Sequence, residues 1–222
     1  MTGTTITVHG SFETFRPAER ATVHVGVGFE GPKRESVVTE TTRSTQALVA
    51  GIVDRHDPEH GPVTWWASDR IRVWSSRPFN DKGEQKPLVH HALTSTRAKF
   101  RDFEELARWV ERAATHPGVR IDGIDWALTE STKQSLIADV RRRAVEDARA
   151  KAEEYAGALG LSEVSCVALA DPGMLGDQVH GGGGGPVAFA RAASMKADAG
   201  GLELTPEDIA VSASVDARFV AS

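Results

Sequence analysis

The sequence predicts an α+β fold in which helices pack on one face of a largely antiparallel sheet. Two observations point to it. Apolar and polar residues alternate strictly near both ends of the chain, and apolar residues recur three or four positions apart in segments between them. The first pattern is typical of a half-buried strand and the second of an amphipathic helix. Because hairpin-like strands are mixed with helices along the chain, an antiparallel sheet covered by helices is expected.

The first 60 residues predict two strands followed by a helix. Residues 4–30 are extended, with a turn at Arg16-Pro17. The second strand alternates clearly, with apolar residues at Val23, Val25, Val27 and Phe29. A helix then begins after Gly31-Pro32, because apolar residues from 37 to 53 form one stripe.

The middle of the chain predicts a hairpin, a short helix and a bulged strand. Residues 63–76 and 87–100 are extended and joined by the turn-forming segment 77–83. Asp102 and Glu105 form a capping box, which predicts the start of a helix at this point. In the strand over 119–128 the alternation shifts by one residue at Asp122-Gly123, as it does in a β-bulge.

The longest predicted helix covers about 132–159. Ser131 and Gln134 form a second capping box at its start, and Gly160 follows its end. Its apolar stripe consists mostly of alanine, so this helix can lie close to the surface on which it packs. The stripe comprises Leu136, Ile137, Val140, Ala144, Ala148, Ala152, Tyr155, Ala156 and Leu159.

The C-terminal part predicts a short strand, a loop and a long strand. A strand covers 164–170, and small residues with the run Gly181–Gly185 indicate a flexible Gly-rich loop at about 171–201. The last strand alternates most clearly of all, with apolar residues at Ile209, Val211, Ala213, Val215, Ala217 and Phe219. We expect a single domain over 4–220.

Composition excludes several classes of protein. The net charge is −5 and the pI is about 5.9, so the chain lacks the basic excess of a nucleic-acid-binding protein. No apolar run is long enough to span a bilayer. The N-terminus lacks the features of a signal peptide, and we therefore expect a soluble, cytoplasmic protein. The single cysteine, Cys166, lies among Val164, Val167 and Leu169, which predicts a small buried apolar residue rather than a redox site.

Three stretches of the sequence stand out together. They are Ile6–Gly10 with Pro17–Val27, Ile121–Leu128 with Arg143–Gly160, and Pro206–Val215. In this order and spacing they resemble the SIMPL-domain family of bacterial proteins, which includes periplasmic immunogenic proteins and a group linked to oxidative-stress defence. The likeness covers about 4–220. It implies an α+β fold and homo-oligomers, in some members ring- or channel-like, with no catalytic residues to carry over.

Motifs for catalysis, cofactors or metals are not found. The glycine run is not followed by the helix and the Lys-Ser/Thr pair of a phosphate loop. His56 and His60 lie in a turn without CxxC or HExxH spacing, so a metal ligand set is not predicted. GxSxG is also absent, which leaves a hydrolase without support.

The hypothesis of self-association is based on two adjacent tryptophans, Trp65 and Trp66. Because neighbouring residues of a strand point to opposite faces, either Trp65 or Trp66 must face away from the core. An exposed tryptophan is typical of an interface anchor. We therefore expect a non-enzymatic protein that forms homo-oligomers, as a scaffold or in stress defence. The alternative is a small-molecule or metal-binding module, with its site near the turn at 56–60 or under the loop at 171–201.

Overall fold

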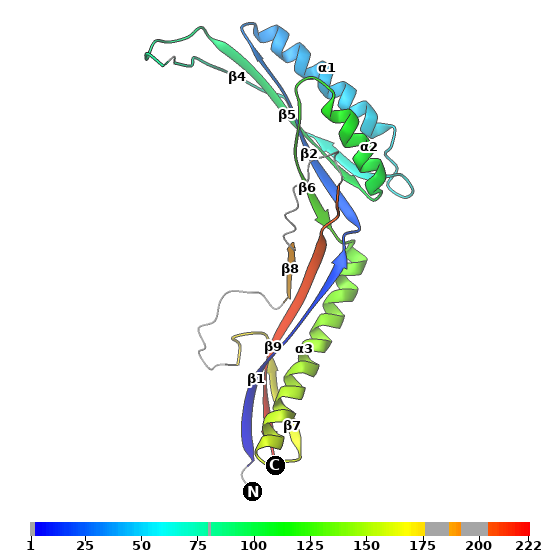
Figure 1. Ribbon diagram of the computed structural model, residues 1–222, viewed down its shortest axis with the longest axis vertical. Coiled ribbons are helices and arrows are strands. Elements are labelled where there is room, and N and C mark those ends of the chain that lie inside the picture. The colour runs from blue at the N-terminus through cyan, green and yellow to red at the C-terminus, as the bar shows by residue number, and fades with distance from the viewer. Residues whose placement is uncertain (1–2, 80, 176–186, 192–203) are drawn as a thin grey trace. The chain divides into compact units, whose positions relative to one another are not determined.

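A computed structural model describes residues 3–79, 81–175, 187–191 and 204–222 (Figure 1). The fold is α+β with antiparallel sheets, as the sequence predicts. The chain divides into two compact units. The first unit combines Met1–Ala18, Leu128–Met195 and Glu207–Ser222, and the second comprises Glu19–Ala127 with Lys196–Pro206.

The sheet of the first unit joins the two ends of the chain. β1 (Thr4–Pro17) pairs antiparallel with β9 (Asp208–Ala221) along its whole length, from Thr4 opposite Ala221 to Pro17 opposite Asp208. On the other side of β9 lie β7 (Val164–Ala170) and β8 (Val187–Arg191). β8 is a strand within the segment expected to be a loop, and the run Gly181–Gly185 lies outside the described residues.

The long helix α3 (Glu130–Ala158) covers β1 and β9 on one face of this sheet (Figure 1). The alanines of its predicted stripe are buried: Ala144, Ala148, Ala152 and Ala156 are at most 1% exposed. Tyr155 and Leu159 were predicted in the same stripe but are 58% and 63% exposed. The helix begins two residues earlier than the capping box suggests. Thr129, not Ser131, is the N-cap, and its hydroxyl accepts a hydrogen bond from the Thr132 N–H at 3.4 Å.

The second unit has a five-stranded antiparallel sheet. Its order is β3 (Val63–Ser68), β5 (Val89–Phe100), β2 (Arg20–Gly31) and β6 (Val119–Ala127), and β4 (Arg72–Ser76) pairs with β5 beyond the end of β3. Helix α1 (Arg34–Val53) connects β2 to β3, and α2 (Phe103–Ala114) connects β5 to β6. This order is that of a split β-α-β unit.

Both helices of the second unit cover the same face of its sheet (Figure 1). Aromatic rings pack between these helices and the strands. The ring centroids of Phe100 and Trp109 are 5.8 Å apart, and those of Phe103 and Trp126 are 5.0 Å apart in an edge-on arrangement. Asp102 caps α2 as predicted, because its Oδ1 accepts from the Glu105 N–H at 3.0 Å. In the described part of the chain, no helix covers the opposite face.

The predicted bulge in β6 is confirmed. The register between β2 and β6 shifts between His24 and Val25, which leaves Asp122 as the extra residue. No helix among the described residues is long and apolar enough to cross a membrane.

Candidate self-association surfaces

The two adjacent tryptophans of β3 point to opposite faces of the sheet. Trp66 pairs with buried Ala98 and is itself half-buried. Trp65 pairs with Lys99 and is 42% exposed. The structure therefore decides what the sequence left open: of the pair, Trp65 is available to a partner.

Trp65 lies between basic side chains on the uncovered face of the second sheet. The guanidinium carbon of Arg97 and the Nζ of Lys99 are each 5.9 Å from its ring centroid. Such cation–π contacts orient the ring without burying it. Arg97 and Lys99 thus orient the exposed ring of Trp65 on this face of the sheet.

A second exposed tryptophan, Trp74 of β4, was not singled out from the sequence. It is 46% exposed and stacks on His91 at 5.1 Å, with the ring planes 10° apart. A shallow groove of about 440 Å³ lies beside it, with Gly28 and Arg120 in its lining. A clue was present in the sequence, because Trp74 lies in a short strand with polar neighbours.

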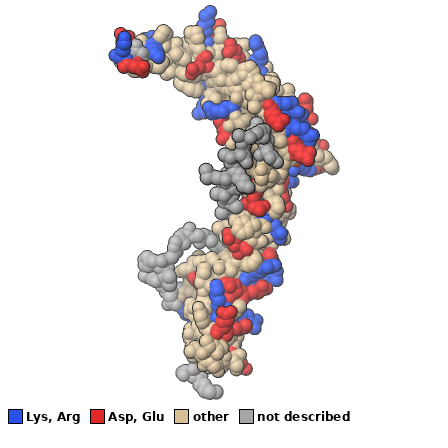
Figure 2. Space-filling view, viewed as in Figure 1, with Lys and Arg blue, Asp and Glu red and all other residues tan. Residues whose placement is uncertain are grey.

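Four side-chain contacts between histidine or arginine and a carboxylate lie on this uncovered face. His24 bonds Asp125 at 2.8 Å, His91 is 3.3 Å from Glu30, Arg97 is 3.9 Å from Asp69, and Arg120 bonds Asp122. Figure 2 likewise shows acidic and basic side chains interspersed on the visible face of the molecule. Exposed tryptophans are enriched at protein–protein interfaces, so this face is the candidate surface of the second unit.

In the first unit the unusual surface is the edge strand β7. Val167 is 55% exposed and Leu169 is 52% exposed. Every residue of β7 from Val164 to Ala170 is uncharged. The sequence contained the signal, because apolar residues at 166–170 are consecutive rather than alternating, which places apolar side chains on both faces of the strand.

The prediction that Cys166 is buried is wrong. Its thiol is exposed, and its Sγ lies 3.5 Å from the Ala168 carbonyl oxygen on the same strand. The reason is the position of β7 in the sheet. Cys166 pairs with Phe219 on the face that α3 covers, but α3 packs on β1 and β9 and barely reaches β7.

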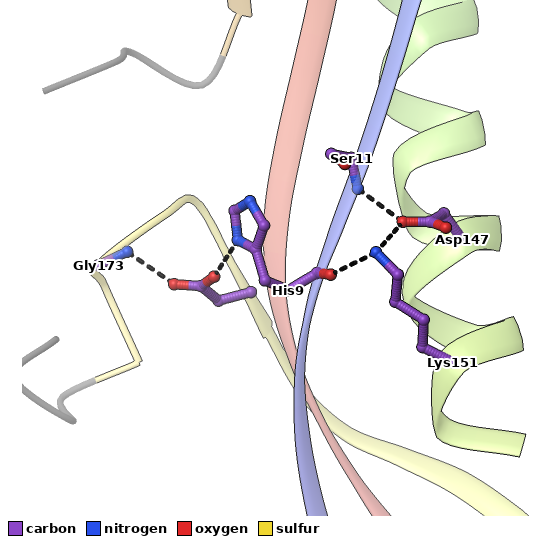
Figure 3. Close-up of polar contacts among 6 residues, drawn as sticks. His9, Ser11, Asp147, Lys151 and Gly173 are labelled. Carbon is purple, nitrogen blue, oxygen red and sulfur yellow. Dashed lines mark hydrogen bonds and ion pairs between the residues drawn. The ribbon is translucent and has the colours of Figure 1, made fainter. Parts of the chain in front are cut away.

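The opposite edge strand, β1, is held by side chains of α3 (Figure 3). Lys151 Nζ donates to the His9 carbonyl oxygen at 3.0 Å, and the Ser11 N–H donates to Asp147 Oδ2 at 2.8 Å. Lys151 and Asp147 also bond each other at 2.7 Å. The hydrogen bonds from Lys151 and Ser11 hold the pKa of Asp147 below its ordinary value.

Asp216 of β9 fastens the segment that follows β7 (Figure 3). Its Oδ1 bonds His9 Nδ1 at 2.8 Å, and its Oδ2 accepts from the Gly173 N–H at 2.7 Å. Burial raises the pKa of Asp216, but these two hydrogen bonds outweigh it and leave the pKa below its ordinary value. Asp216 therefore connects β9 to His9 of β1 and to Gly173 in the segment after β7.

Side-chain hydrogen bonds hold the backbone of the turn at 56–60. Asp57 Oδ1 accepts from the N–H groups of Glu59 and His60, which lowers the pKa of Asp57. Arg101 donates to the carbonyl oxygens of Pro58 and Glu59. A cavity of about 670 Å³ adjoins the turn, yet within the described ranges no three His, Cys, Asp or Glu residues are grouped to hold a metal ion.

Two comparisons with known proteins bear on the identity of the chain. None of the curated proteins matches this chain. The model of one protein family, SIMPL, described as a protein of unknown function (DUF541), matches residues 6–219. That match spans the strands that open and close the first unit and all of the described elements between them. The chain therefore belongs to the SIMPL family.

Proposed function

We propose that this SIMPL protein is a non-enzymatic, self-assembling scaffold, and that Trp65 lies at a contact between copies of the chain. The observation that carries the proposal is the large exposed ring of Trp65 on a sheet face that no described helix covers. The occupant we propose for this face is a second copy.

The energy available at Trp65 is that of an interface anchor. A tryptophan buries up to about 250 Å². With 42% of its surface exposed, about 100 Å² remains to be covered. At about 25 cal/mol per Å² this corresponds to about 2.5 kcal/mol, which is in the range of hot-spot residues. Arg97 beside the ring lies 3.9 Å from Asp69, and such a charged pair suits the polar rim of an interface.

The use of the polar clusters supports a structural rather than a catalytic role. Asp147 and Lys151 hold the backbone of β1, and Asp57 and Arg101 hold the backbone of the turn at 56–60. Asp57 and Arg101 also line the cavity of about 670 Å³, but their side chains are already bonded to the backbone of the turn. Turnover in a broad esterase and phosphatase screen of the purified protein would contradict this part of the proposal.

The test is the solution mass of the wild type and of Trp65→Ser, measured by size-exclusion chromatography with light scattering. We expect the wild type to exceed the chain mass of 23.8 kDa and Trp65→Ser to have a lower mass. Phe79→Ser is the matched control, because Phe79 is 62% exposed in the same unit but lies outside the sheet. Trp66 is left intact, because it is half-buried.

Circular dichroism of Trp65→Ser shows whether the variant is folded. A wild type that is monomeric at micromolar concentration would overturn the proposal of self-assembly. An oligomer whose mass is the same in wild type and Trp65→Ser would remove Trp65 from the contact.

A further inference from the structure

We infer that β7 is a second contact between copies of this chain, formed when two β7 strands pair antiparallel about a twofold axis. The inference rests on the proposed self-assembly and adds a named strand in the first unit, distinct from the Trp65 face in the second. A twofold contact joins the same patch of both copies, so the patch must be self-complementary.

The backbone of β7 is available for such pairing. β7 ends the strand order β1-β9-β7, so within the described residues only one of its sides is hydrogen-bonded to a strand. An edge strand presents a row of N–H and C=O groups that another strand can use. Antiparallel pairing of two β7 strands would use these groups on either side of the bulge at Val167.

The other edge of the same sheet shows what a protected edge looks like. Lys151 and Asp147 of α3 already bond the His9 carbonyl and the Ser11 N–H, which lie in the middle of β1 (Figure 3). Charged side chains at an edge strand are a common means of preventing association. β7 carries no charge at all, so the two edges of one sheet differ in the property that controls pairing.

The side chains of β7 fit a second copy better than a charged partner. Val167 and Leu169 are more than half exposed, and Met174 just beyond the strand is 73% exposed. The register shift between Cys166 and Ala168 makes Val167 the extra residue of a bulge. An axis near Val167 would place the uncharged side chains of both β7 strands against each other, with the acidic residues Glu163 and Asp171 just outside the paired strands.

Cys166 makes the inference directly testable, because it is the only cysteine of the chain and lies on this strand. A disulfide requires Cβ atoms about 3.5–4.5 Å apart, so it reports pairing at one register. We would oxidise the wild type mildly, together with Val167→Cys and Ala168→Cys in a Cys166→Ser background. Thr7→Cys in the same background is the matched control on the protected edge. Non-reducing electrophoresis measures the covalent dimer.

We expect at least one of the three β7 positions to give covalent dimer at least tenfold faster than Thr7→Cys. A second variant tests the contact without a covalent crosslink. Val167→Lys should raise the dissociation constant of the oligomer at least tenfold, and the control variant Thr7→Lys should leave this constant unchanged. Val167 is exposed, so this lysine does not enter the core.

The outcomes separate this inference from the proposed function. If the wild type is an oligomer but no β7 position crosslinks and Val167→Lys has no effect, the β7 contact is wrong while self-assembly stands. If the wild type is monomeric, both fail. A disulfide to a different protein, with none between copies, would overturn the second copy as the occupant.

Discussion

Gly10 marks the closest approach of β1 and α3, and Gly10→Ala is the sharpest test of how the first unit is packed. A methyl group at this position would lie 2.1 Å from the Ala144 carbonyl oxygen, 2.6 Å from the Ala148 Cβ and 2.7 Å from the Ala148 nitrogen. Two of these three atoms belong to the helix backbone, so a rotamer change cannot relieve the clash.

The size of the effect follows from these distances. A carbon and a carbonyl oxygen ordinarily approach no closer than about 3.3 Å. The distance of 2.1 Å is about 1.2 Å too short, so α3 must move away from β1 by about that amount. Overpacking of this kind costs about 3 kcal/mol, and alanine in a strand recovers about 0.5 kcal/mol relative to glycine. The free energy of unfolding should therefore fall by about 2.5 kcal/mol.

Urea unfolding followed by circular dichroism measures this loss. Tryptophan fluorescence reports the unfolding of the second unit alone, because all five tryptophans lie in it, and so shows whether the loss of stability is confined to the first unit. Gly157→Ala is the matched control: no atom lies within 4 Å of the added methyl group, so the same exchange in α3 should stabilise by about 0.5 kcal/mol. A Gly10→Ala protein as stable as the wild type would refute the close packing of β1 on α3.

Two further predictions concern the polar contacts of α3. The lowered pKa of Asp147 contributes stability that is fully present above its ordinary pKa of 3.8 and is lost as the pH falls through the lower pKa of the folded state. The stability difference between wild type and Asp147→Asn should therefore vanish in that acidic window, as urea titrations at a series of pH values would show; a constant difference would contradict the assignment. Thr129→Ala should cost about 1 kcal/mol as a lost N-cap, and Ser131→Ala clearly less; the reverse order in thermal unfolding would restore Ser131 as the cap.

Local patterns in the sequence predicted the strands and helices well. The alternation in β2 and β9 and the capping box at Asp102 depend on neighbours a few residues away, and such local signals survive in any tertiary context. The start of α3 was predicted at the wrong residue because Thr129 and Ser131 are both good N-caps. In the structure the Thr129 hydroxyl accepts from the Thr132 N–H, and the sequence pattern alone does not distinguish this arrangement from a cap at Ser131.

Tertiary neighbours decided what the sequence could not. Cys166 has the apolar neighbours of a core residue, and it is exposed only because β7 is the edge strand beyond the reach of α3. Similarly, alternation required one of two tryptophans to face outward, but the pairing of Trp65 with Lys99 determined which one. The division into two sheets depends on the pairing of β1 with β9, and these strands are separated by almost the whole chain.

The two proposed contacts together have a consequence that neither has alone. A single twofold contact closes a dimer and then stops, because each copy has used its only patch. Two different contacts on one chain, at Trp65 and at β7, allow growth beyond the dimer into larger closed or open assemblies. Trp65→Ser and Val167→Lys should then each leave an intermediate species, and only the double variant should reach 23.8 kDa. If either single variant is already monomeric, the other surface does not hold copies together on its own.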